Sequence, residues 1–105
     1  MKFTVELKRG SISSALRDCG YAPLGIDPAA QELIFVKSLG RMYPRFHIYC
    51  KAVSGSHVFA LNLHLDQKRP TYQGVSAHSG EYEGSIVEAE AKRISSTIHE
   101  AKPSL

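Results

Sequence analysis

The fold is decided by two alternating segments in the middle of the chain, residues 45–53 (RFHIYCKAV) and residues 57–65 (HVFALNLHL). In both, apolar side chains alternate with polar ones, which is the period of a strand with one buried face. A two-residue turn at Ser54 and Gly55 would join them, because both residue types favour tight turns. The segments therefore predict an antiparallel hairpin at the centre of the domain.

The register of the hairpin follows from this turn, which pairs Val53 with Ser56. The facing apolar pairs are then Phe46 with Leu63, Ile48 with Leu61, and Cys50 with Phe59. A slip of one residue would place His64 opposite Phe46 and mix apolar with polar side chains. We therefore expect one buried face and one open face, with His47 and His64 on the open face.

An amphipathic helix is predicted on either side of this hairpin. The first begins at Ser11, a good N-cap, and ends before Gly20, a residue typical of helix C-termini. The second begins at Ser85, which opens a capping-box pattern, and ends before Pro103. Their apolar stripes are Ile12, Ala15, Leu16 and Cys19 in the first helix and Val87, Ala91, Ile94 and Ile98 in the second. Spacings of three and four residues place each stripe on one helix face.

Two further segments before the hairpin carry strand patterns. Residues 3–8 alternate apolar and polar side chains, as a half-buried strand does. Residues 33–36 (LIFV) suggest a buried strand, whereas residues 28–38 could instead form a helix capped by Asp27. The strand is favoured, because short apolar runs of this kind are typical of strands. Residues 22–31, with their prolines and glycine, are expected to form turns.

These elements combine into a single α+β domain that spans residues 1–105. We expect a two-layer sandwich, with a mainly antiparallel sheet of three to four strands and both helices on one face. An apolar content of 43%, a charged content of 22% and a net charge of +3 are those of a soluble globular protein. Neither a signal peptide nor an apolar run of about 18 residues is found, so we expect a cytoplasmic protein without a membrane partner. Cys19 and Cys50 fall on apolar faces and are expected to be buried thiols.

The polar face of the hairpin and the segment after it carry most of the histidines. Two or three imidazoles with a carboxylate are a common composition of a catalytic zinc site, which keeps a position for water. The candidate ligands are His47, His64, Asp66 and His78. Their spacing matches no compact metal motif, and hydrogen-bonded or solvated surface histidines are the alternative. One hypothesis is therefore a protein that binds zinc or another divalent metal, with hydrolysis as its reaction.

The same face also suits a nucleic acid, because basic side chains pair with phosphates and tyrosine rings stack on bases. The candidate contacts are Arg45, Tyr49, Lys51, Lys68, Arg69 and Tyr72. Several glutamates follow from Glu81 onwards, so the basic patch is local, and an ordinary mixed-charge surface is the alternative. Residues 66–84 form a longer irregular connection than is usual, which favours a binding loop or local disorder.

Two resemblances add to these patterns. Residues 45–49, 61–68 and 77–82 (RFHIY, LNLHLDQK and AHSGEY) resemble a set of small bacterial proteins whose function is not established. The turn Gly55-Ser56-His57, between a short helix ending in Gly20-Tyr21 and a closing helix, resembles HicA-type mRNA-interferase toxins. That resemblance implies a fold like that of double-stranded-RNA-binding domains, αβββα, here with an extra N-terminal strand. It also implies His57 as the catalytic base.

From these observations we expect a small binding module that uses the open sheet face and residues 66–84, with RNA as its ligand. The zinc or other divalent-metal protein is one alternative. A domain for protein interaction or homo-oligomerisation, through the free edge of the third strand or the open face, is the other. The three hypotheses place the function on the same surface or at its edge.

Overall fold

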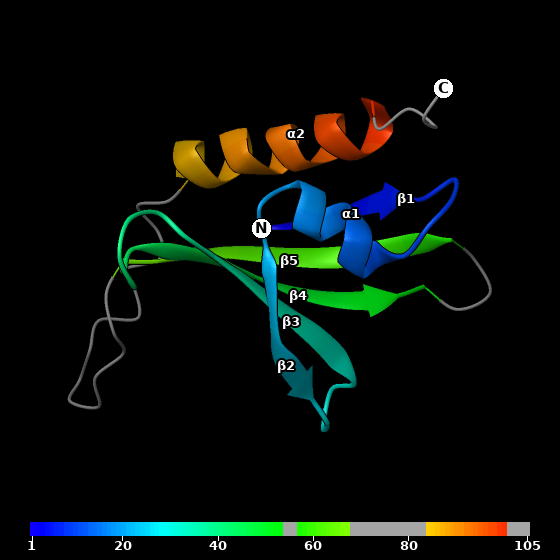
Figure 1. Ribbon diagram of the computed structural model, residues 1–105, viewed down its shortest axis with the longest axis horizontal. Coiled ribbons are helices and arrows are strands. Elements are labelled where there is room, and N and C mark those ends of the chain that lie inside the picture. The colour runs from blue at the N-terminus through cyan, green and yellow to red at the C-terminus, as the bar shows by residue number, and fades with distance from the viewer. Residues whose placement is uncertain (54–56, 68–83, 101–105) are drawn as a thin grey trace.

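A computed structural model of the chain describes residues 1–53, 57–67 and 84–100. Two helices lie together on one side of a single twisted sheet, which makes two layers (Figure 1). The elements in chain order are β1 (Lys2–Glu6), α1 (Ile12–Asp18), β2 (Ala22–Asp27), β3 (Glu32–Ser38), β4 (Arg45–Ala52), β5 (Val58–Asp66) and α2 (Gly84–Glu100). The predicted α+β sandwich is confirmed. None of the helices within the described ranges has the length and apolarity that crossing a membrane requires.

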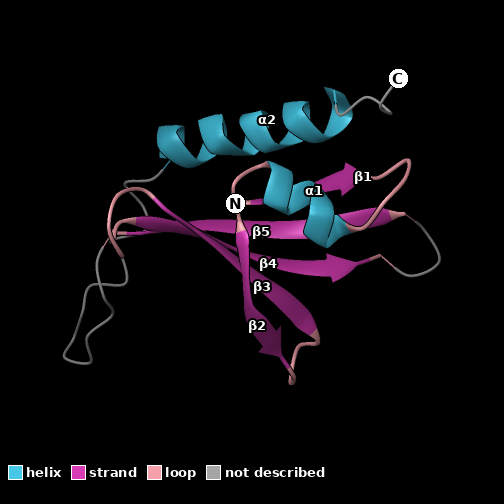
Figure 2. Cartoon of the chain, in the orientation of Figure 1, coloured by secondary structure: helices cyan, strands magenta, loops and turns pink. Residues whose placement is uncertain are grey.

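The sheet has five strands in the order β1-β5-β4-β3-β2, and every neighbouring pair is antiparallel (Figure 2). Strands β2 to β5 follow one another as a meander, and β1 joins the far side of β5. Along the chain, four strands (β2 to β5) therefore separate α1 from α2. The expected αβββα core with three such strands is wrong in this respect, and so is the expected total of three to four strands.

The additional strand is β2, which occupies residues that were expected to form turns. It pairs with β3, and an irregularity between Pro23 and Gly25 interrupts the pairing. An edge strand tolerates both residue types, because one side of its backbone has no partner strand to satisfy. The turn follows later, where the Asp27 carboxylate accepts hydrogen bonds from the N–H groups of Ala29 and Ala30. The strand interpretation of residues 33–36 is confirmed by β3, and the helix alternative is wrong.

The hairpin of β4 and β5 forms as predicted, but its register differs by two residues. The Val53 N–H donates to the Val58 carbonyl at 2.9 Å, so four residues lie between this pair instead of two. The facing core pairs are Phe46 with Leu65, Ile48 with Leu63, and Cys50 with Leu61. Because the alternation has a period of two residues, this shift changes the partners but keeps every side chain on its predicted face.

The core lies between the sheet and the helices. Its helical contribution consists of Ile12, Leu16 and Cys19 from the α1 region and of Val87, Ala91, Ile94 and Ile98 from α2. The Ser11 hydroxyl caps α1 by accepting a hydrogen bond from the Ser14 N–H, as expected of this N-cap. Cys19 and Cys50 are buried free thiols, which confirms their predicted role. Burial raises the pKa of Cys50 to about 12, with a smaller contribution from the charge of Glu32.

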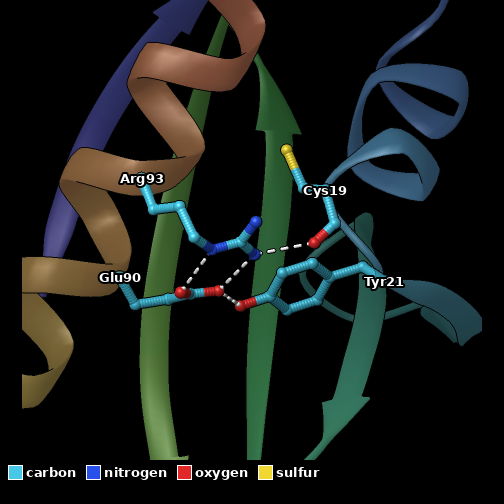
Figure 3. A network of polar contacts seen from close by, with 4 residues as sticks. All are labelled: Cys19, Tyr21, Glu90 and Arg93. Atoms are coloured by element: carbon cyan, nitrogen blue, oxygen red, sulfur yellow. Dashed lines mark hydrogen bonds and ion pairs between the residues drawn. The ribbon is translucent and has the colours of Figure 1, made fainter.

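A buried polar network connects α2 to the end of α1 (Figure 3). The Tyr21 hydroxyl donates to Oε2 of Glu90 at 2.6 Å, and Arg93 donates two hydrogen bonds of 2.8 Å to the same carboxylate. Arg93 also donates to the carbonyl oxygen of Cys19 at 2.7 Å. Burial alone would raise the pKa of Glu90, but the hydrogen bonds from Arg93 and Tyr21 outweigh it and lower that pKa. The ionised Glu90 therefore holds the two helices in position over the sheet.

Candidate nucleic-acid interface

The face of the sheet opposite the helices is covered by no helix or strand that the structure describes (Figure 1). We call this surface the open face. Its central side chains are Arg45, His47, Tyr49 and Lys51 from β4 and Asn62, His64 and Asp66 from β5. They alternate with buried apolar side chains on both strands, so the sheet geometry alone directs them away from the core. Most of them are half-buried, because neighbouring side chains on the two strands pack against one another.

Three rings stand together at the centre of the open face. His47 and His64 face each other across the two strands, and their ring centroids lie 4.9 Å apart with planes inclined by 25°. The Tyr49 ring meets His47 edge to face at 5.0 Å and lies 6.2 Å from His64. We call these three residues the ring cluster. Such offset and edge-to-face contacts are favourable arrangements of aromatic rings.

Asp66 orients one of these rings. Its Oδ2 lies 2.7 Å from Nδ1 of His47, and because an ionised carboxylate only accepts, Nδ1 is the donor. Nε of Arg45 donates to the same oxygen at 3.5 Å. Desolvation would raise the pKa of Asp66, but the hydrogen bonds and charges of His47 and Arg45 lower it overall. Asp66 is therefore ionised at neutral pH and fixes the orientation of His47.

His64 has a different electrostatic environment. Burial lowers its pKa, electrostatic interactions with His47 and the N-terminal ammonium group lower that pKa further, and Asp66 acts more weakly in the opposite direction. Because the ordinary pKa of histidine is about 6.5, His64 is uncharged at neutral pH. The open face thus presents a neutral imidazole at its centre.

The basic side chains lie around the ring cluster. The Arg45 guanidinium lies 4.8 Å from the centroid of the Tyr43 ring, a cation–π distance. Lys51 is exposed near the far end of β4. Of the predicted nucleic-acid contacts, the structure therefore brings Arg45, Tyr49 and Lys51 onto one face. The others, Lys68, Arg69 and Tyr72, lie outside the described residues.

The predicted metal ligands are brought together only in part. His47, His64 and Asp66 are neighbours on the open face, whereas His78 lies outside the described residues. The two imidazoles stack on each other, and the Asp66 carboxylate is engaged by His47 and Arg45. Within residues 1–53, 57–67 and 84–100, no group of three or more His, Cys, Asp or Glu side chains is arranged to hold a metal ion. The described residues therefore do not form a zinc-binding site.

His57, the expected catalytic base, lies far from this cluster. It is exposed beside the start of β5, where its carbonyl oxygen accepts a hydrogen bond from the Leu7 N–H at 3.0 Å. His64 follows it by seven residues, which is about 23 Å along a strand at ~3.3 Å per residue. His57 therefore does not share a site with the imidazoles of the open face.

Sequence reasoning missed which residues of β4 and β5 face each other directly. The predicted register places Arg45 opposite His64 and His47 opposite Asn62. The structure places Arg45 opposite Asp66 and His47 opposite His64. Opposite charges favour direct cross-strand positions, and the pair of Arg45 with Asp66 arises only in the observed register. This charge pair was the signal in the sequence that could have identified the site's geometry.

A search with models of protein families finds none that matches this chain, and a search of curated proteins finds no match either.

Proposed function

We propose that this chain is an RNA-binding module that acts in the cytoplasm and uses the open face to hold single-stranded RNA. The observation that carries the proposal is the ring cluster of His47, Tyr49 and His64, which lies on the side of the sheet that the helices leave uncovered. A sheet that displays rings in this way is a common platform for unpaired bases.

Base stacking is the expected source of affinity. Each base has a π face, so stacking on an aromatic ring tolerates many sequences and contributes about 1–3 kcal/mol per base. Tyr49 is half-buried and already held by edge contacts with both histidines, so little further ordering is needed for it to receive a base. The neutral His64 adds a ring without adding charge.

Phosphate contacts are expected from side chains at the border of the ring cluster. Arg45 and Lys51 lie at the two ends of β4, and Lys2 of β1 is placed beside Asn62 of β5. Asp66 lies close to Arg45 and reduces the local positive charge. We therefore expect modest affinity with a shallow salt dependence, in which each phosphate contact contributes about −0.7 to the slope of log K against log salt.

The first test replaces the central ring. Tyr49→Ala should weaken binding of a fluorescent single-stranded RNA about 5- to 150-fold, the equivalent of one lost stacking contact of about 1–3 kcal/mol. Fluorescence anisotropy at two salt concentrations measures the affinity and the slope. His99→Ala, an exposed change on α2, is the matched control and should leave binding unchanged.

The salt dependence separates stacking from phosphate contacts. Lys51→Ala should reduce the slope by about 0.7 and weaken all sequences equally. Equal affinity of wild-type, Tyr49→Ala and Lys51→Ala proteins, with unchanged melting temperatures, would contradict an RNA site on the open face.

A further inference from the structure

We propose that β1 pairs with β1 of a second copy of this chain, so that two five-stranded sheets join into one. The proposal rests on other observations than the RNA-binding function, and Lys2 is the one residue that both use. It starts from the position of β1 at one edge of the sheet, where none of the described strands pairs with its outer side. The opposite edge is formed by β2, in which Pro23 and an irregular register disfavour pairing with another strand.

The hydrogen bonds of β1 identify which backbone groups point outward. Met1 and Leu63 exchange two hydrogen bonds, and the Leu7 N–H donates to His57 at the other end of the strand. Because hydrogen-bonded pairs alternate along an antiparallel ladder, the odd-numbered residues of β1 bond to β5. The outward groups are therefore the N–H and C=O groups of Lys2, Thr4 and Glu6.

These three residues are complementary to themselves under a two-fold rotation. With the axis at Thr4, Thr4 faces Thr4 of the second copy. Lys2 of each copy then faces Glu6 of the other, which gives two such pairs. All outward N–H and C=O groups of the three residues then find partners in one register. Both charge pairs join opposite signs, and Phe3 lies beside Val5 of the second copy on the side of the core. Opposite charges and paired threonines are favourable at directly facing positions.

The helix layer also fits this arrangement. α2 packs against both β1 and β5, so its axis lies above the boundary between these strands. With strands about 4.8 Å apart, that boundary is about 5 Å from the two-fold axis. The two copies of α2 would then lie about 10 Å apart, which is within the range of packed helices. The joined sheet would carry both open faces on one continuous surface.

Single cysteines test the register. Thr4→Cys should form an intermolecular disulfide under mild oxidation, because facing residues of a hydrogen-bonded pair have Cα atoms about 5.5 Å apart. Lys2→Cys and Glu6→Cys should not cross-link alone, since each lies about 13 Å from its own copy, but their mixture should cross-link. Leu24→Cys, exposed on the opposite edge strand, is the control. The native Cys19 and Cys50 are buried and should not interfere.

Thr4→Pro and charge reversal test the contact in solution by sedimentation. Thr4→Pro removes an outward N–H that β5 does not use, so the monomer should fold while self-association is lost. Lys2→Glu and Glu6→Lys should each weaken self-association roughly tenfold, and their equimolar mixture should restore it. Cross-linking of Thr4→Cys no faster than that of Leu24→Cys, or a wild-type monomer up to roughly 1 mM, would overturn the proposal.

Discussion

At the scale of single residues, Glu90 illustrates how a charge can be built into the core. It is 7% exposed, yet the hydroxyl of Tyr21 and the guanidinium of Arg93 both donate to its carboxylate. The predicted apolar stripe of the closing helix does not include it, although Glu90 lies three residues after Val87 and four before Ile94 and therefore borders that stripe. A buried carboxylate is tolerated only where donors replace the lost water, and here they come from two different parts of the chain.

Glu90→Ala should lower the free energy of unfolding by roughly 2 kcal/mol, measured by urea denaturation. The substitution leaves the Tyr21 hydroxyl buried without its acceptor. The loss stays below that of a fully buried ion pair, because the Arg93 side chain is 41% exposed and can be hydrated. Glu88→Ala, an exposed change on the same helix, should shift stability by less than about 0.5 kcal/mol. Equal stabilities of the two variants would show that the network contributes nothing.

At the scale of elements, Gly20 at the end of α1 shows how one residue determines the path of the chain from a helix into the next strand. Gly20 has φ +100°, its N–H donates to the Arg17 carbonyl, and the Tyr21 N–H donates to the Leu16 carbonyl. These two hydrogen bonds form a Schellman motif, which requires a left-handed residue. The motif directs Tyr21 into the core, where its hydroxyl reaches Glu90.

Gly20→Ala should therefore lower the melting temperature by about 4–16 °C, since the left-handed conformation costs an alanine about 1–2 kcal/mol. A Cβ at this position would lie 3.0 Å from Cε of Lys37, a flexible side chain that can move aside, so the backbone conformation sets the cost. Gly40→Ala is the matched control: a Cβ there meets nothing within 4 Å, and its melting temperature should stay at the wild-type value. Thermal melts followed by circular dichroism compare the variants.

At the scale of the whole molecule, the two faces of the sheet carry different kinds of polar network. Glu90 lies on the helix side and Asp66 on the open face, and both have lowered pKa values in the folded protein. Burial opposes the shift in both cases, while hydrogen bonds from Arg93 and Tyr21, and from His47 and Arg45, outweigh it. Each carboxylate thus contributes stability that depends on its being ionised.

The wild-type protein should therefore lose stability as the pH falls below about 4, the ordinary pKa range of unfolded Asp and Glu. The unfolded chain binds more protons than the folded one there, so stability increases with pH in this window and is complete above it. Urea denaturation between pH 2 and 7 measures this slope, which the double variant Asp66→Asn with Glu90→Gln should reduce. An unchanged slope in that variant would assign the acid sensitivity to other groups.

The sequence by itself determined which side chains share a face. The alternation in residues 45–53 and 57–65 separated the buried face from the open one, and the stripe spacings placed both helices on the buried side. Those periods depend only on local backbone geometry, so they can be read without knowing any partner.

Only the tertiary structure decided which side chains touch. A shift of two residues leaves an alternating pattern unchanged, so the pattern does not distinguish Arg45 opposite Asp66 from Arg45 opposite His64. In the same way, β2 is a strand because β3 supplies its hydrogen-bond partners, despite its proline and glycine. The site on the open face depends on which residues of β4 and β5 pair with each other. A periodic pattern within one segment does not specify that pairing.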